Sequence, residues 1–346
     1  MALLGDQISQ IPVSTSTRTG LLNSLWNRNA APKLKSEELD LEAYFAYHTQ
    51  QCIQAWHDGG RHIADCTHRD IAEIAQEIID GSAREDIKSR LALKLTAPKS
   101  AKQDELLGSC IDFTARLVSM MDIGVLQYAF SGRRQLEWKH GSLIDIVHDY
   151  FNEPVVLVHD KVKLGKMFNA RNLSQIAGIQ IEWTDNLADH LRIIDDEDKK
   201  VAIFHHASFL RYNRSPLFPD GLAEETLRTL ALLFPQTDKD SLKWFKKLPC
   251  SLGLDKTLVK CGHLRVDSRQ IENFRFWHDR LVILKQVFDE SRPSTLLQWW
   301  CDRRNGVQWY TFWVAILVLF LTIFFGMVQS IESALQVYKA YHPTVT

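Results

Sequence analysis

One uninterrupted apolar stretch dominates the hydrophobic pattern of the chain. Residues 309–328 read WYTFWVAILVLFLTIFFGMV and contain no charged side chain. A helix of this length is roughly 30 Å long, which matches the hydrocarbon core of a bilayer. Trp309 and Trp313 stand at its start, where aromatic rings favour the headgroup region, and Gly326 and Val328 stand at its end. The pattern predicts a transmembrane helix, with a buried core helix as the alternative.

The flanks of this stretch predict its orientation. Arg303 and Arg304 precede it and only Lys339 follows it, and cytoplasmic flanks usually carry the excess of basic residues. The N-terminal segment lacks the apolar core of a signal peptide. We therefore expect a tail-anchored, single-pass membrane protein with a cytosolic N-terminal body. The glycosylation sequons that begin at Asn172 and Asn213 offer a test, because a luminal body could be modified there.

Apolar residues upstream recur at three- and four-residue steps, which predicts a mainly helical α+β body. Residues 1–35 show no periodicity and are interpreted as a flexible tail. A helical layer is expected over residues 36–135, with helices that start after Ser36, Thr67 and Ser82.

The middle of the chain, residues 136–265, combines helices with short strands. Alternating apolar residues predict a first strand, and two further apolar runs predict a β-hairpin around an acidic turn. The first strand is expected at residues 179–183. The two hairpin strands are expected at residues 191–194 and 201–204, with the acidic turn at residues 195–198 between them. With the helix expected after Ser142, the hairpin suggests a winged-helix-like unit. Four acidic residues in its turn would repel phosphate, which argues against DNA binding.

The remaining segments lead to the membrane and beyond it. Residues 268–290 are expected to form the longest soluble helix, within a juxtamembrane region of residues 266–308. Residues 309–328 then cross the bilayer, and residues 329–346 are expected to form a short tail.

Composition excludes some classes of protein. The chain has 346 residues, with 41 Lys plus Arg and 42 Asp plus Glu, so its formal net charge is −1. Dedicated nucleic-acid binders usually carry a basic excess, so no nucleic-acid partner is expected. Six scattered cysteines without a C-x-x-C pair favour reduced thiols over a disulfide framework. Cys301 lies close to the apolar stretch and is a candidate for S-palmitoylation, with an unmodified thiol as the alternative.

Candidate chemistry is sparse. The sequence contains no G-x-x-x-x-G-K-[ST], G-x-G-x-x-G, H-E-x-x-H or G-x-S-x-G motif. The best polar cluster consists of Asp185, Asp189, His190, His205 and His206, because the hairpin could bring His190 near His205. Two histidines with carboxylates can hold a metal, whereas the alternative is polar residues that cap strand ends. We predict no catalytic residue and no cofactor.

Three small residues in and after the apolar stretch lie four apart. Gly326, Ser330 and Ala334 would let two helices approach closely, which suggests a homodimer. Placement against lipid is the alternative.

Several segments resemble a family of filamentous-fungal proteins with a single membrane span. The segments are GSLIDIVHDYF, NARNLSQIAGIQIEWTDNLADHL, VAIFHHASFL, SPLFPDGLAEETLRTLALLFP and LLQWWCDRRNGVQWYTFWVAILVLFLTIFFGMVQSIESALQVYKAYHP. The resemblance covers residues 105–343 and implies a fungal single-span membrane protein without an assigned activity, so no catalytic residue is carried over. The chain also resembles CorA-like divalent-cation channels in having its apolar segment at the C-terminal end. Those channels carry a Gly-Met-Asn motif and two spans, whereas Val328 follows Gly326-Met327 here.

Together these features predict a non-enzymatic adaptor whose cytosolic body binds protein partners at a lipid bilayer. Two alternatives remain open. One is a membrane-tethered, metal-dependent enzyme that uses the region of Asp185, His190 and His205, and the other is a CorA-like channel subunit.

Overall fold

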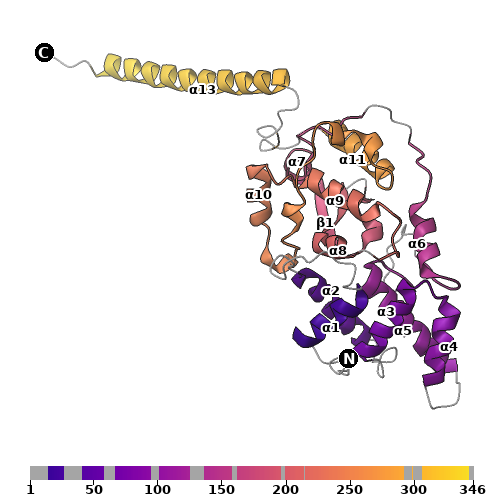
Figure 1. Cartoon of the computed structure of the whole chain (residues 1–346). Helices are drawn as coiled ribbons and strands as arrows, with labels where there is room; N and C mark the ends of the chain where they lie inside the picture. Colours follow the sequence, from indigo (N-terminus) through magenta and orange to yellow (C-terminus); the bar gives the residue numbers. More distant parts are fainter. Residues whose placement is uncertain are drawn as a thin grey trace. The chain divides into compact units, whose positions relative to one another are not determined.

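The computed structural model describes residues 15–26, 41–57, 67–94, 101–124, 136–157, 162–195, 199–213, 215–291, 298 and 306–342. Within them the chain is mainly helical with one small sheet, and it ends in a long apolar helix, as the sequence predicts (Figure 1). The chain divides into two compact units. The first unit contains Met1–Ser174 and Ile179–Glu290. The second unit contains Gln175–Gly178 and Ser291–Thr346.

The N-terminal part of the first unit is a layer of helices around α5. The bounds are α1 Thr15–Leu25, α2 Glu42–His57, α3 His68–Ile79, α4 Arg84–Lys94 and α5 Ala101–Ser119. Helices α2, α3 and α4 pack against α5, and α1 packs against α3. Thr67 begins α3, as the sequence predicts, because its hydroxyl accepts the backbone N–H of Asp70 while the Asp70 carboxylate accepts the N–H of Thr67.

Helix α1 differs from the expected flexible tail. Leu21, Leu25 and Trp26 are buried. The Trp26 ring meets Tyr44 and Phe209 edge-on, with ring centroids 4.7 and 5.7 Å apart. The apolar residues occupy only the last turns of a segment rich in Ser and Thr, so periodicity over a longer window does not detect this helix.

The rest of the first unit surrounds a three-stranded sheet. Its elements are α6 Leu143–Phe151, α7 Ala170–Gln175, β1 Gln180–Thr184, β2 Ile193–Asp195, β3 Lys200–Phe204, α8 Ala207–Tyr212, α9 Leu222–Leu233, α10 Lys239–Lys246 and α11 His278–Glu290. The strand order is β1-β3-β2. Strands β2 and β3 form the predicted antiparallel hairpin, whereas β1 pairs with β3 in parallel. Residues 196–198 of its acidic turn lie outside the described residues, and the winged-helix-like comparison stays a prediction.

The helix predicted over residues 268–290 begins only at His278. Two short 3₁₀ turns, Asp267–Arg269 and Ile271–Asn273, precede it. The cause is a carboxylate from α9: Glu225 accepts the backbone N–H groups of Arg275, Phe276 and Trp277 at 2.8, 2.8 and 2.9 Å. Amides that bind a side chain do not bond to the carbonyl four residues earlier, so a helix that began at residue 268 could not continue through residues 275–277.

The cysteines differ from expectation at one position. Cys110 is disulfide-bonded. Cys52, Cys250 and Cys261 are free thiols, as expected. The other two cysteines, at positions 66 and 301, lie outside the described residues, and with them the predicted palmitoylation site. Because disulfides are rare in the cytosol, the bond at Cys110 counts against a cytosolic body.

Candidate functional site

The candidate site lies where two parallel strands end. Register pairs Thr184 of β1 with Phe204 of β3, so the residues that follow, Asp185 and His205, emerge side by side. His206 comes next in the chain. Carboxyl ends of parallel strands are the usual place for binding sites in open sheets. The parallel pair, and not the predicted hairpin, therefore assembles this cluster.

Both imidazoles point at one carboxylate oxygen. The distances from Asp185 Oδ1 are 2.6 Å to His206 Nε2 and 3.2 Å to His205 Nε2. The two rings stack with centroids 3.9 Å apart. Both histidines are buried, whereas the Asp185 side chain is 38% exposed. The carboxylate is consequently the group through which solvent reaches the cluster.

The hydrogen bonds determine where the protons lie. The backbone N–H of Asp255 donates to His205 Nδ1 at 3.4 Å, so Nδ1 accepts and Nε2 is the nitrogen that carries a proton toward Asp185. His206 Nδ1 is buried and has no hydrogen-bond partner in the described part of the chain. The Asp185 carboxylate at 2.6 Å from His206 Nε2 only accepts, so the proton is on Nε2 here as well.

Burial and these bonds shift the acidities. Burial, together with the nearby His205, lowers the pKa of His206 to about 4. Burial alone would raise the pKa of Asp185, but the bonds from His205 and His206 outweigh it and hold that pKa below its ordinary value. The cluster therefore consists of an ionised carboxylate and a neutral His206 near neutral pH.

The other two residues of the predicted cluster bond elsewhere. The Asp189 carboxylate accepts Asn186 Nδ2 at 3.0 Å and lies 3.3 Å from the Arg192 guanidinium. His190 Nδ1 accepts the backbone N–H of Phe204 at 3.2 Å, and His190 Nε2 lies 2.7 Å from Thr229 Oγ1. Each is thus held by internal hydrogen bonds, and the structure brings together only Asp185, His205 and His206.

Sequence reasoning missed Asp255, which supports the cluster from behind. Its carboxylate accepts the backbone N–H of Ser208 at 2.6 Å and both the N–H and the hydroxyl of Thr257 at 2.8 and 2.7 Å. An Asp two residues before a Thr is a signal for a local turn of this kind. Its proximity to His205, fifty residues away, had no signal in the sequence.

The donor set suits a transition metal in type and spacing. One ligand atom from each of Asp185, His205 and His206 lies within 4.8 Å of the others. Two imidazoles and a carboxylate are ligands that Zn²⁺ accepts. A metal-bound imidazole usually donates its second N–H to an acceptor, however, whereas His205 Nδ1 faces a donor. The ligand atoms of the cluster therefore suit a metal. The contact at His205 Nδ1, however, is the one expected in a hydrogen-bonded cluster without a metal.

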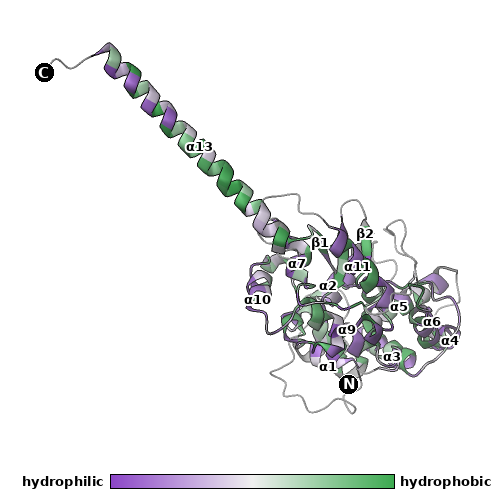
Figure 2. Ribbon diagram, turned by 90° about the horizontal axis from the view of Figure 1, so that it is seen from above, coloured by the Kyte–Doolittle hydropathy of each residue, from purple (hydrophilic) through white to green (hydrophobic). Residues whose placement is uncertain are grey.

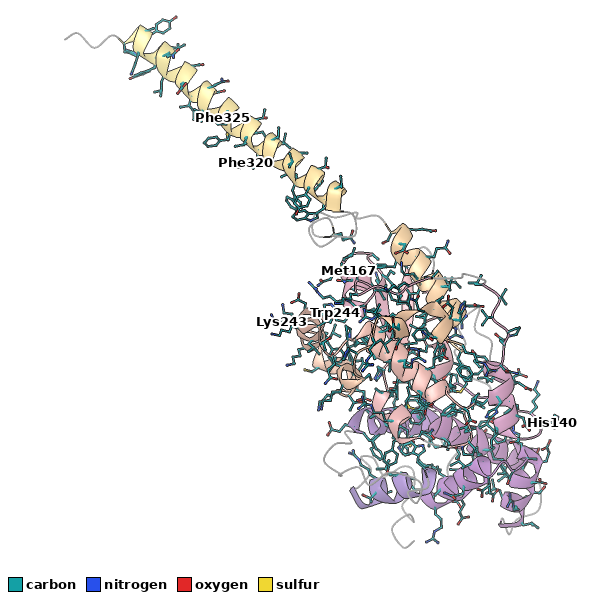
Figure 3. The ribbon with its side chains drawn as sticks, turned by 45° about the horizontal axis from the view of Figure 1, so that its top comes forward. His140, Met167, Lys243, Trp244, Phe320 and Phe325 are labelled. Carbon is teal, nitrogen blue, oxygen red and sulfur yellow. The ribbon has the colours of Figure 1, made fainter. Side chains whose placement is uncertain are left out.

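Helix α13, Gly306–Tyr341, carries the remaining candidate residues. Its apolar part is 0% buried, and it continues beyond Val328 through most of the expected tail. Figure 2 shows that the apolar residues concentrate in one part of the helix and that its C-terminal end is mixed. Phe320 and Phe325, which Figure 3 labels on this helix, are 64% and 58% exposed. Trp309 and Trp313 contact each other at its start, with ring centroids 6.2 Å apart.

The small residues of α13 show no packing partner among the described residues. The Ser330 hydroxyl donates to the Gly326 carbonyl of its own helix at 2.9 Å. A Cβ added at Gly326 would meet nothing within 4 Å. The contact through Gly326, Ser330 and Ala334 stays a prediction.

The described chain is thus a mainly helical body followed by one helix that is long and apolar enough to cross a membrane. Comparison of the chain with protein-family models, curated proteins and solved structures returned no match. The resemblance to the fungal family therefore depends on the sequence segments alone.

Proposed function

We propose that this protein is anchored in a membrane by α13 and that its helical body is a cytosolic adaptor for other proteins. The observation that carries the proposal is an apolar helix of bilayer length with none of its apolar part buried. A core helix of a soluble protein would be mostly covered by its own fold. The fungal family and a homodimer through α13 are proposed on the sequence pattern, and the adaptor role on the lack of a recognised catalytic motif.

The orientation of the body is supported by Arg303 and Arg304 and opposed by the disulfide at Cys110. The native sequons do not decide it, because Asn172 and Asn213 are 7% and 4% exposed. Their side-chain amides donate to the carbonyls of Met167 and Val118. Because the folded body encloses these two asparagines, an unmodified sequon at either position does not exclude a luminal body.

An exposed sequon gives the decisive test of orientation. Pro154→Thr makes Asn152, which is exposed, an acceptor for N-glycosylation. In translation with microsomes we expect no glycan on this variant. A second sequon, appended after Thr346, should gain a glycan because it lies beyond the span. A glycosidase-sensitive mass increase in Pro154→Thr, with none at the appended sequon, would place the body in the lumen and overturn the cytosolic orientation.

A metal-dependent activity is the second candidate, favoured by the convergence of Asp185, His205 and His206. If this reading is correct, the full chain in detergent binds one equivalent of Co²⁺ with a d–d absorption band. Asp185→Asn preserves the shape of the ligand but removes its charge, and it should weaken binding at least about tenfold.

The matched control is His263→Ala, which removes an exposed histidine outside the cluster. It should leave binding unchanged. Substoichiometric metal, or equal binding by wild type and Asp185→Asn, would assign the cluster to the hydrogen-bonded support of the sheet.

A further inference from the structure

Helix α10 carries a face made only of lysines. Lys239, Lys243, Lys246 and Lys247 recur at steps of four, three and one residues, so they fall within about 100° around the helix axis or its extension. All four are exposed, and none of their ammonium groups has a hydrogen bond or ion pair with another described residue. We call these four residues the lysine face. Figure 3 places Lys243 at the outer edge of the body.

The opposite side of α10 holds the helix in place. Ser241 is buried, and the ring centroid of Phe245 lies 6.0 Å from that of Phe234 and 6.5 Å from that of Trp183. The acidic residue of the helix, Asp240, is turned toward Arg171 at 3.7 Å. The lysine face is therefore fixed on the surface by packing behind it, and no acid of its own helix neutralises it.

The surrounding segment adds to this charge. Residues 239–269 contain eight Lys or Arg and three Asp or Glu, a net charge of +5 in a chain whose net charge is −1. One of the three acids, Asp255, is buried and fully bonded. Lys246 and Lys256 also line one cleft of about 810 Å³, in which the Lys256 ammonium lies 3.8 Å from the Glu42 carboxylate. A chain that is neutral overall thus has a local excess of basic residues in the segment that contains the lysine face.

We propose that the lysine face docks on the anionic surface of the bilayer that holds α13, an inference that depends on the proposed anchoring and on the proposed cytosolic orientation. Cytoplasmic leaflets carry anionic lipids, and each lysine near such a surface favours binding about fivefold. Four lysines alone would bind a membrane weakly. The anchor makes the contact intramolecular, because residues 291–305 are all that separate α11 from α13 in the sequence. Docking would then fix which side of the body remains available to partners.

The test uses the full chain in vesicles of phosphatidylcholine, with or without phosphatidylserine. A water-soluble acetylating reagent reports the accessibility of each lysine by mass spectrometry. We expect acetylation of the lysine face to fall about tenfold when phosphatidylserine is present and to recover in high salt. Lys139, whose side chain is 72% exposed elsewhere on the body, should react equally in both lipids.

A variant separates docking from general effects of lipid. With Lys243→Glu, Lys246→Glu and Lys247→Glu, Lys239 remains as the reporter and should react equally in both vesicles. Equal acetylation of the wild-type lysine face in both lipids, in chains that float with the vesicles, overturns docking and leaves the anchor intact. Chains that do not float with either vesicle overturn both proposals.

Discussion

Replacing Leu317 and Leu321 by arginine should release the full chain from membranes. Both side chains lie near the centre of the apolar stretch and are 56% and 41% exposed. A leucine-to-arginine change at the middle of a membrane helix costs about 3 kcal/mol of insertion free energy, so the pair costs about 6 kcal/mol. The measurement is the fraction of protein that resists alkaline carbonate extraction and floats with membranes.

The matched control is Leu317→Phe with Leu321→Phe, which keeps the apolar surface and should remain in the membrane. The alternative of a buried core helix makes the opposite prediction. In that case wild type is already extracted by carbonate, and the arginine pair lowers the urea midpoint of the body instead. An arginine variant that stays membrane-integrated would also contradict the span.

The sequence predicted those elements that local chemistry determines. Thr67 and Ser142 bond to the first turns of α3 and α6, as capping residues do. The β2–β3 hairpin follows from two short apolar runs around an acidic turn. The long apolar helix α13 follows from twenty residues without charge. Each of these signals lies within a few residues of the element it specifies.

The sequence did not predict the features that depend on distant partners. Helix α11 starts late because Glu225 binds amides fifty residues away in the chain. The candidate cluster needed the parallel pairing of β1 with β3, which no local pattern indicates. The sequence therefore predicted a polar cluster of five residues, of which only Asp185, His205 and His206 come together in the structure. His190 was grouped with them because hairpin pairing was the nearest available geometry.

Glu225→Ala should destabilise the body more than most single changes in it. Glu225 is 6% exposed, and its two carboxylate oxygens accept three backbone N–H groups. Burial raises the pKa of this carboxyl, and the three bonds partly offset that cost. Alanine leaves these amides without an acceptor beside Trp277, which is itself 1% exposed. We expect a loss of about 3–5 kcal/mol in the free energy of unfolding.

Glu224→Ala is the matched control, because it removes the same charge from the same turn of α9 at an exposed position. It should change stability by less than about 0.5 kcal/mol. Urea unfolding of the full chain in detergent measures both, and the Glu225→Ala midpoint should fall by about 1–2 M. Hydrogen exchange adds a local readout: the amides of Arg275, Phe276 and Trp277 lose protection only if Glu225 holds them. Equal midpoints for the two variants, with exchange unchanged at these amides, would mean that α11 starts where it does without Glu225, and that the cause lies in the packing of Trp277 alone.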